Sequence, residues 1–281
     1  MDPEPADVLA RVEHFHDAVP RDAARAEDVG PLVLFVREGA GFPFYARPRI
    51  DGTAPPSAAD IAAVRDRQRE LGLPETFEWL HERQPGLLSV ARSAGLTVLE
   101  APLMVLDRAA LPAPEQLSDV PVRVLSPSAS DFGAALAVRR AVAAIGFGAP
   151  GTARGPAGPA ERDATTVELT DEVLAEERIR ARDGRRLSAL AGTPQEGALA
   201  SGMAMRVGAV AEIAGVATLP SARRRGLGAA VTAALAGRLL ADGVDLVFLS
   251  AGSEEIARVY LRAGFRRIGT ACIAGPTATL G

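Results

Sequence analysis

The sequence predicts an α/β protein of the α+β, mixed-sheet kind, built in two parts. Short apolar runs that suit buried strands alternate with longer helical segments along the chain. Apolar residues make up 48% of the 281 residues, which is enough to fill a core. A stretch rich in proline and polar residues, 111–121, separates two halves. We therefore expect domains at residues 1–112 and 121–281, joined by a linker at 113–120.

The C-terminal half follows the order β-α-α-β-β-β-α-β-α-β. Ser126 and Ser128 stand where a cap of the first helix is expected, and Thr170 stands before the second. Between these helices, residues 148–160 are dense in Gly, Pro and Ala, so we expect a mobile loop there. The expected elements are strands at 122–125, 186–191, 197–205, 208–219, 245–250 and 265–273, and helices at 131–145, 171–182, 227–241 and 253–263.

The N-terminal half has a less regular pattern. Ser57 is placed to cap the clearest of its helices, and Gly39 and Gly41 lie between its first two strands. The expected helices are at 5–18, 58–71 and 86–94, and the expected strands are at 31–36, 42–46, 76–80 and 97–106.

A faint internal repeat links the two halves. Residues 87–96 can be aligned with residues 256–265, because each segment has a helical pattern, then Ala-Gly, then an apolar residue and a strand. One interpretation is a decayed duplication. The other is coincidence, because this pattern is common. In the N-terminal half, residues 51–56 replace the basic glycine turn described below, and Ala91 stands opposite Tyr260.

Composition excludes several classes of protein. The net charge of −4 disfavours a general nucleic-acid binder. A single cysteine, Cys272, rules out an internal disulfide and a multi-cysteine metal site. His14 and His16 are two apart, so they do not share a helix face as a metal pair would. No apolar run spans a bilayer and the first residues lack a signal-peptide pattern. We expect a cytoplasmic protein without a metal and without a membrane or nucleic-acid partner.

The most informative segment is the basic turn after the strand that ends near Thr218. Residues 223–228 read Arg-Arg-Arg-Gly-Leu-Gly, which fits R-x-x-G-x-G, and an alanine-rich helix follows. Such a turn directs several free backbone N–H groups and the positive end of a helix dipole at one point, which suits a phosphate or pyrophosphate. Glycine at these positions lets the backbone approach the ligand closely. Taken alone, a run of arginines is more often a solvated patch.

A second motif follows the turn. Ser253, Ala257, Tyr260, Gly264 and Phe265 form the pattern S-x-x-x-A-x-x-Y-x-x-x-G-F. Ala257 and Tyr260 are one helical turn apart and therefore lie on one face of the helix. The rival dinucleotide fingerprint G-x-G-x-x-G is not present after a first strand, and a phosphate loop of the G-x-x-x-x-G-K-[ST] kind is impossible because the chain has no lysine.

Together, the two motifs and the element order resemble the GNAT superfamily of acetyltransferases, over about residues 121–275. The resemblance implies acetyl-CoA as co-substrate, with its pyrophosphate on the backbone N–H groups of Arg224 to Ala229. It also implies that pantetheine pairs with the edge of the strand at Val216–Thr218, that Tyr260 is the general acid, and that Ser253 stands where the family often has Asn. The cofactor-binding residues implied are Val216, Ala217, Thr218, Arg223, Arg224, Arg225, Gly226, Leu227, Gly228, Ala229 and Ser253.

A general base is also expected, because an attacking ammonium must lose a proton. Glu212 lies on the strand before the turn, at a position where several members of the family carry a base. Its alternative role is an outward-facing carboxylate paired with an arginine. The alternative role of Tyr260 is a half-buried aromatic residue with a satisfied hydroxyl.

We therefore expect an acetyl-CoA-dependent N-acetyltransferase that transfers the acetyl group to a primary amine by direct attack in a ternary complex. The N-terminal half is then a degenerate GNAT-like domain, and a homodimer is possible. Two other classes stay open: a non-catalytic acyl-CoA sensor and an interaction protein that binds acidic partners. The acceptor stays unidentified, because Asp163, Glu168 and Glu172 favour a cationic molecule whereas Arg139 and Arg140 favour an anionic one.

Overall fold

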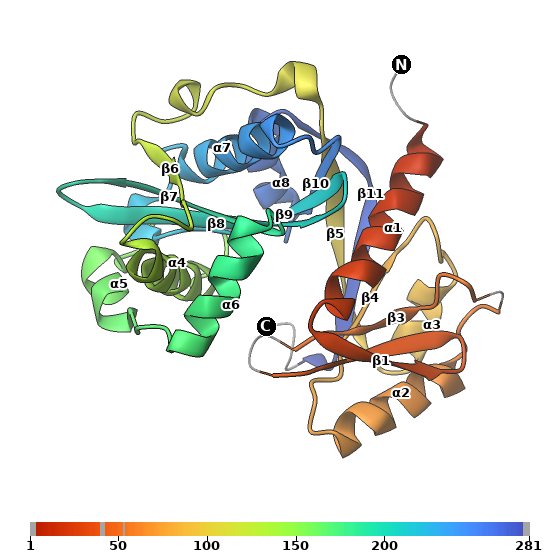
Figure 1. The fold of residues 1–281 in the computed structure, drawn as a ribbon. Coiled ribbons are helices and arrows are strands. Elements are labelled where there is room, and N and C mark those ends of the chain that lie inside the picture. Colours follow the sequence, from red (N-terminus) through yellow and green to blue (C-terminus); the bar gives the residue numbers. More distant parts are fainter. Residues whose placement is uncertain (1–3, 40–42, 53, 278–281) are drawn as a thin grey trace. The chain divides into compact units, whose positions relative to one another are not determined.

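The structure is a computed structural model that describes residues 4–39, 43–52 and 54–277 (Figure 1). The chain forms two compact units. Unit 1 contains residues 1–103 and 268–281, and unit 2 contains residues 104–267. The chain passes from one unit to the other inside two strands, β5 (Thr97–Leu106) and β11 (Phe265–Gly275). This grouping differs from the expected division, because residues 268–275 of the last strand pack with the N-terminal unit.

Unit 1 has a sheet in the order β1-β2-β3-β4-β11-β5. Strands β2 and β3 form the expected pair, which is antiparallel, but β3 begins only at Ala46, where the expected strand 42–46 ends. Strands β3 and β4 are parallel and share a single register pair, Ala46 with Phe77. Strand β1 was not predicted from the sequence, since half of its residues are charged and it forms an edge of the sheet. The elements are α1 (Pro5–Arg21), β1 (Ala24–Val29), β2 (Leu32–Arg37), β3 (Ala46–Pro48), α2 (Ala58–Glu70), β4 (Phe77–Leu80) and α3 (Leu87–Ser93).

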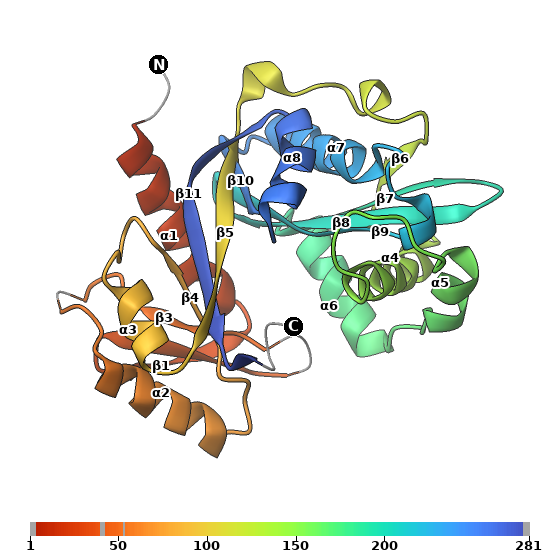
Figure 2. The same cartoon turned by 180° about the vertical axis from the view of Figure 1, so that it is seen from behind.

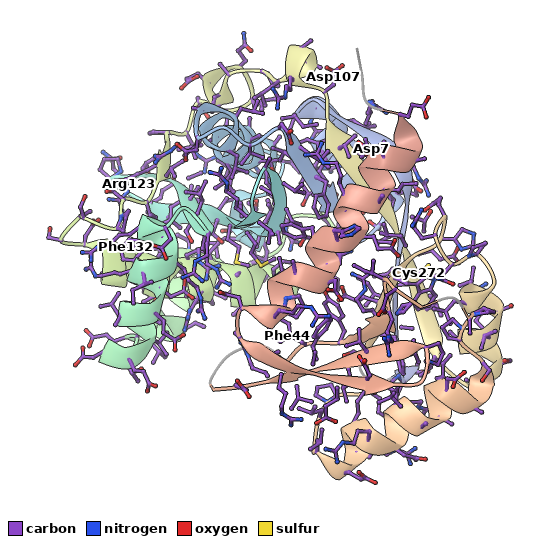
Figure 3. All side chains as sticks on the ribbon, turned by 45° about the vertical axis from the view of Figure 1, so that its right-hand side comes forward. Asp7, Phe44, Asp107, Arg123, Phe132 and Cys272 are labelled. Atoms are coloured by element: carbon purple, nitrogen blue, oxygen red, sulfur yellow. The ribbon has the colours of Figure 1, made fainter. Side chains whose placement is uncertain are left out.

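The core of unit 1 gathers apolar residues from its sheet and from α2 and α3. Phe77 and Trp79 of β4 pack there with Cys272 of β11, which is fully buried (Figure 3). Burial raises the pKa of the Cys272 thiol to about 12, so it is an unreactive core residue. Cys272 is paired in register with Trp79, which fixes β11 beside β4.

Unit 2 has a sheet in the order β5-β10-β9-β8-β7-β6. Its antiparallel strands β6 to β9 are followed by one parallel pair, β9 with β10. Short 3-10 helices lie at Arg108–Ala110, Pro114–Gln116 and Pro220–Ala222. The other elements are β6 (Val122–Val124), α4 (Phe132–Phe147), α5 (Pro159–Thr165), α6 (Asp171–Arg182), β7 (Arg186–Thr193), β8 (Gly197–Val207), β9 (Val210–Thr218), α7 (Leu227–Ala241), β10 (Leu246–Ser250) and α8 (Glu254–Arg262).

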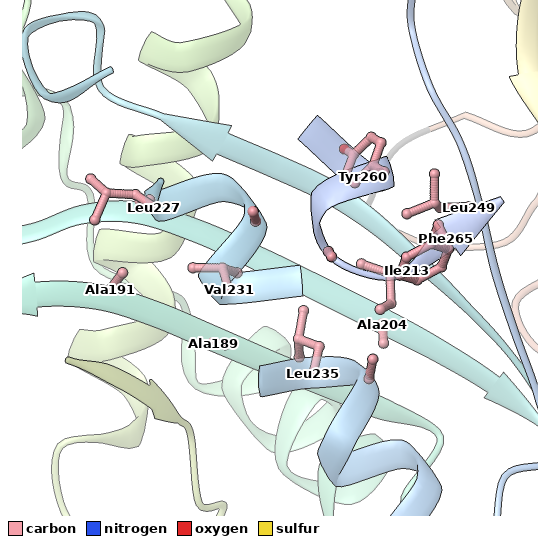
Figure 4. Packing of buried hydrophobic residues seen from close by; sticks show 14 of the residues in the cluster. Ala189, Ala191, Ala204, Ile213, Leu227, Val231, Leu235, Leu249, Tyr260 and Phe265 are labelled. Carbon is pink, nitrogen blue, oxygen red and sulfur yellow. The ribbon is translucent and has the colours of Figure 1, made fainter. Parts of the chain in front are cut away.

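Helices cover both faces of the sheet of unit 2, with α4, α5 and α6 on one side and α7 and α8 on the other (Figures 1 and 2). The larger core lies under α7 and α8, where Val231 and Leu235 pack with Ile213 and Phe265 (Figure 4). A smaller cluster under α4 includes Phe132 (Figure 3). Side chains alternate along each strand, so every strand residue faces one of these two helix layers.

Two features are absent from the described residues. No helix among them is both long and apolar enough to cross a membrane. Likewise, no three of their His, Cys, Asp or Glu side chains gather into a group that would hold a metal ion.

Candidate active site

The central feature of unit 2 is the divergence of its two parallel strands. Strands β9 and β10 pair at three positions, the last of which joins Glu212 to Phe248. Beyond Glu212, β9 continues to Thr218 beside β8, and its other edge carries backbone groups that have no strand partner in the described part of the chain. An unpaired strand edge accepts an extended ligand in place of a strand. The predicted pantetheine-binding residues Val216, Ala217 and Thr218 all lie on this edge.

A bulge in β9 marks the middle of the free edge. The register with β8 shifts between Ser201 and Met203, so Gly202 faces both Gly215 and Val216. Gly215 has a φ of +60°, a conformation that favours glycine. The bulge changes the direction of the strand next to the divergence, as bulges near active sites commonly do.

The basic turn has the backbone geometry of an anion site. Arg224 (φ 65°) and Gly226 (φ 78°) both adopt left-handed conformations, and α7 begins directly afterwards without a side-chain cap. The six consecutive N–H groups from Arg224 to Ala229 donate to no acceptor in the described part of the chain. Unsatisfied N–H groups at a helix N-terminus, reinforced by the helix dipole, form a site for a phosphate.

The two glycines of the turn serve different purposes. A Cβ at Gly226 would lie 1.9 Å from the carbonyl oxygen of Leu117, so the protein itself requires glycine there. A Cβ at Gly228 would have no protein atom nearer than 3.7 Å. Protein packing therefore does not explain Gly228, and the absence of a side chain there leaves the backbone open to a ligand.

The three arginines of the turn also differ. Arg223 is only 9% exposed, and its guanidinium donates to the carbonyls of Gly146 (2.9 Å), Ala153 (3.0 Å) and Ala149. Arg225 forms an ion pair with Glu196 at 3.1 Å. Arg224 is exposed beside the cavity described next. The side chains of Arg223 and Arg225 are thus engaged with the protein. The backbone N–H of Arg223 also donates to Pro220 O at 3.4 Å, so Arg223, contrary to the prediction, has neither its guanidinium nor its N–H available for a cofactor. Arg225 keeps a backbone N–H without an acceptor among the described residues.

Arg223 also anchors residues 148–160, the segment for which we expected a mobile loop. Besides the guanidinium bonds, Gly155 N donates to Pro220 O (3.2 Å) and Ser221 N donates to Ala157 O (2.9 Å). The segment is therefore attached to the basic turn at several points, and it continues into α5, a helix that the sequence analysis did not anticipate.

A cavity of about 780 Å³ lies between these elements, a size typical of ligand sites. The free edge of β9, the basic turn, the end of α4 and the exposed side of α8 line it. Of the predicted residues, Glu212, Val216, Ala217, Thr218, Arg223, Arg224, Gly226, Leu227, Gly228 and Tyr260 line the cavity, whereas Arg225, Ala229 and Ser253 do not.

Tyr260 reaches the cavity from α8 and is 8% exposed. Its ring packs edge-on against Phe265, with 6.4 Å between the centroids (Figure 4). Its hydroxyl makes no hydrogen bond within the described residues. Burial raises the pKa of Tyr260 to about 12, which keeps the hydroxyl protonated at neutral pH. A protonated, unpaired hydroxyl at a cavity wall is suited to proton donation.

Glu212 lines the cavity where β9 and β10 separate. It is half-buried and lies opposite Met205 of β8. Ser253 instead caps α8, because its Oγ accepts from Ile256 N at 3.2 Å. This bond gives Ser253 a structural reason for its place in the motif.

Part of the cavity wall was not predicted from the sequence. Gly146 packs so closely on β9 that a Cβ would lie 2.8 Å from that of Ala217. The next residue, Phe147, lines the cavity while 62% exposed, and Thr152 donates to Glu255 across the cavity rim. Arg258 and Arg262 line it from one face of α8. Only the i, i+4 spacing of these two arginines was visible in the sequence.

Comparisons with known proteins bear on the fold. The sequence model of the family described as FR47-like protein matches residues 191–274. No curated protein sequence matches the chain. Among solved structures, it is similar to a GCN5-related N-acetyltransferase from Kribbella flavida, with a TM-score of 0.67 and 23% identity over 95% of both chains.

Two further structures are similar over nearly the whole chain. A GCN5-related N-acetyltransferase from Sphaerobacter thermophilus has a TM-score of 0.55 and 18% identity, covering 97% of this chain and 93% of its own. A tandem GNAT protein from the clavulanic acid biosynthesis pathway has a TM-score of 0.50 and 17% identity, covering 96% and 93%. The predicted fold class is confirmed: this chain has a GNAT-like fold.

Proposed function

We propose that this protein is an acetyl-CoA-dependent N-acetyltransferase that acylates a primary amine. The observation that carries the proposal is the run of free N–H groups from Arg224 to Ala229 beside the free edge of β9. Both features open on one cavity, which Tyr260 also lines. The tandem GNAT protein and the two N-acetyltransferases similar to this chain support the same activity.

The basic turn and the free edge of β9 fit acetyl-CoA. The N–H groups of the basic turn would hold its pyrophosphate, and Gly228 leaves room for that group because a Cβ there meets no close protein atom. The backbone of Val216, Ala217 and Thr218 would pair with the pantetheine arm. When bound, acetyl-CoA supplies the acetyl thioester that the acceptor nitrogen attacks.

Two side chains would move protons at this site. Glu212 would accept the proton that the acceptor's ammonium loses, because an amine attacks only in its neutral form. Tyr260 would donate a proton from its hydroxyl to the leaving sulfur, and its pKa of about 12 keeps that proton in place beforehand. A backbone N–H at the bulge would polarise the thioester carbonyl. The lone cysteine, Cys272, is fully buried in unit 1, so we propose direct attack without an acyl-cysteine.

A ligand titration tests the binding step. The melting temperature of the full chain is measured with acetyl-CoA, NAD and ATP in parallel. A ligand present at a hundred times its dissociation constant stabilises a protein by about 2.7 kcal/mol. We expect this stabilisation with acetyl-CoA and not with NAD or ATP. No response to acetyl-CoA would contradict the proposal.

Release of CoA thiol in the presence of a panel of amines then tests catalysis. Turnover with any primary amine that exceeds hydrolysis supports the enzyme. Tight binding of acetyl-CoA without turnover, unaffected by Tyr260→Phe, would instead indicate a non-catalytic acyl-CoA sensor.

A further inference from the structure

Arg139 of α4 is a buried side chain with unused hydrogen-bonding capacity. It is 7% exposed, and its buried Nε has no acceptor among the described residues. In the same part of the chain, the one hydrogen bond of its side chain is a weak one, from Nη1 to the sulfur of Met203 at 3.6 Å. Burial lowers the pKa of Arg139 to about 10, so it remains charged at neutral pH. A buried guanidinium without an anionic partner is costly, which makes this position unusual for a purely structural arginine.

The surroundings of Arg139 do not supply the missing anion. Its charged neighbours are Glu177, Arg140 and Arg186. Glu177 Oε1 already lies 3.1 Å from Arg186 Nη1 and 3.7 Å from Arg140 Nη2. Arg186 also has an unsatisfied donor, because its Nε is buried without an acceptor among the described residues. Three arginines against one glutamate give this cluster a net charge of +2, with two unused buried donors.

The cluster lies on the same face of the sheet as the proposed base. Ser201 Oγ donates to the carbonyl of Arg139, so Ser201 and its alternate neighbours on β8 face α4. Met205 is on this face, and its register partners on either side are Arg186 of β7 and Glu212 of β9. Two strand spacings separate the backbones of Arg186 and Glu212, which is about 10 Å.

Met203 connects the cluster to the cavity. It touches Arg139 through its sulfur and is the register partner of Ala214, which lines the cavity. It also borders Gly215, where a Cβ would lie 3.5 Å from Met203 Cγ. Met203 is half-buried, and a methionine side chain changes conformation easily, so a ligand group can displace it.

The acidic residues that favoured a cationic acceptor do not compete with this cluster. Asp163, Glu168 and Glu172 are all exposed to solvent. Asp163 in addition accepts from Arg162 at 2.8 Å. On this side of unit 2 the buried charge that lacks a partner is therefore positive.

We propose, on the basis of the proposed function, that the acceptor amine carries an anionic group which binds Arg139 and Arg186 while its nitrogen faces Glu212. A carboxylate or a phosphate supplies the acceptor oxygens that both unused Nε groups lack. The backbone separation of about 10 Å favours an acceptor whose amine and anionic group are several bonds apart.

Matched pairs of acceptors test this proposal on the full chain. The pairs are 6-aminohexanoate with 6-aminohexanamide, and phosphoethanolamine with ethanolamine. We expect kcat/KM, measured by thiol release, to be at least tenfold higher for the anionic member of one pair. The pair that shows the preference identifies a carboxylate or a phosphate. Equal use of both members in both pairs overturns the proposal.

Variants of the cluster provide the second test. Arg139→Met keeps the apolar volume and removes the charge, and we expect it to reduce the anion preference to less than twofold. Arg139→Lys keeps the charge and retains part of the preference. The exposed Arg238→Gln is the matched control and is expected to leave the preference unchanged. An anion preference that survives in Arg139→Met overturns the assignment of this residue.

Two binding readouts separate this proposal from the proposed function. The dissociation constant for acetyl-CoA is expected to stay within twofold in Arg139→Met. If wild-type protein neither binds nor turns over acetyl-CoA, the proposed function fails. The anion site is then measured by thermal shift with 6-aminohexanoate, its amide and inorganic phosphate. A shift seen only with the anions and lost in Arg139→Met supports the site, and identical responses overturn it.

Discussion

The two units contain corresponding pairs of parallel strands, β3 with β4 in unit 1 and β9 with β10 in unit 2. In each unit a helix lies between the paired strands and a second helix follows them. The second helix ends in both units before a left-handed glycine, Gly95 (φ 78°) or Gly264 (φ 86°). These local matches agree with the predicted internal repeat. The chemical difference between the units lies in what occupies the region beside each pair.

In unit 1 the protein fills that region with its own side chains. Arg47 of β3 is 1% exposed, donates to the carbonyl of Glu13 at 2.7 Å, and pairs with the Glu13 carboxylate at 3.5 Å. The helix that corresponds to α7 begins with a capping box, in which Asp60 accepts from Ser57 N at 2.8 Å. The Asp60 carboxylate therefore lies at the helix N-terminus where α7 would hold a phosphate. Unit 1 supplies its own anion, whereas unit 2 leaves the place open.

The largest effect is expected from Tyr260→Phe, which removes the proposed proton donor; unit 1 has no such group, because Ala91 stands at the matching position. The ring is retained, so packing on Phe265 and binding of acetyl-CoA are expected to be unchanged. Loss of a general acid commonly costs about 10²–10⁴ in rate, and we expect kcat to fall by about 10²–10³. Steady-state thiol release measures kcat, and calorimetry measures the affinity. A variant with normal kcat would exclude Tyr260 as the acid.

A large effect on stability is expected from Arg223→Met. Three backbone carbonyls lose their donor, and hydrogen bonds to a charged group are worth about 1.5–3 kcal/mol each before compensation by water. We expect a loss of about 2–4 kcal/mol in the free energy of unfolding, measured by chemical denaturation. Arg225→Gln, which breaks a partly exposed ion pair, is the control and is expected to cost less than about 1 kcal/mol. Equal effects of both variants would show that Arg223 does not hold the 148–158 segment.

The helices and strands of unit 2 were largely predictable because their signals are local. Helix α7 has the boundaries that its apolar pattern predicted, and Thr170 caps α6 by accepting from Val173 N. Strand β1 was not predicted, since a polar edge strand has no apolar pattern. The passage of β5 and β11 between units was not predicted either, because strand pairing depends on contacts between distant parts of the chain.

The basic turn could be found from the sequence because it is one continuous motif. The contact that requires glycine at Gly226 could not, because the carbonyl of Leu117 lies far from it in the chain. The partners of Arg223 lie more than 65 residues before it in sequence, and nothing in an Arg-Arg-Arg run shows which of the three is buried. The positive cluster around Arg139 could not be predicted either, because its residues come from three separate elements, α4, α6 and β7.

Gly228→Ala is expected to have two smaller effects: it raises the stability of the protein and lowers its affinity for acetyl-CoA. Alanine replaces glycine inside the first turn of a helix and meets no close protein atom, so we expect a gain of about 0.5–1 kcal/mol in unfolding free energy. Its methyl group also occupies the place where the backbone would meet the pyrophosphate, so we expect acetyl-CoA affinity to fall about tenfold or more.

Gly237→Ala on the same helix is the matched control, because a Cβ there also meets no protein atom within 4 Å. It is expected to give the same stabilisation without a change in affinity. Chemical denaturation and calorimetry with acetyl-CoA measure the two quantities. If both variants bind acetyl-CoA as tightly as the wild type, the ligand does not approach the backbone at Gly228, and unit 2 resembles unit 1 more closely at this helix end.

An effect on stability alone, and only at higher pH, is expected from a buried carboxyl group in unit 1. Burial raises the pKa of Glu78 on β4 to about 7, and nearby Arg47 partly opposes this rise. The unfolded chain has the ordinary value of 4.5, so between pH 4.5 and 7 the folded state binds more protons than the unfolded state. Stability of unit 1 therefore falls as pH rises through this window, and the loss is complete above about pH 7.

Glu78→Gln removes the titration and keeps the shape. Because Glu78 is half-buried, we expect the variant to be more stable than wild type by about 1–2 kcal/mol at pH 8, and equally stable near pH 4.5. His16, whose pKa burial lowers to about 3, is present in both proteins and cancels in the difference. Trp79, the single tryptophan, lies in the core of unit 1, so its fluorescence during denaturation follows this unit. The exposed Glu115→Gln in unit 2 is the control, and a stability difference that does not change with pH would show that Glu78 is charged in the folded protein throughout.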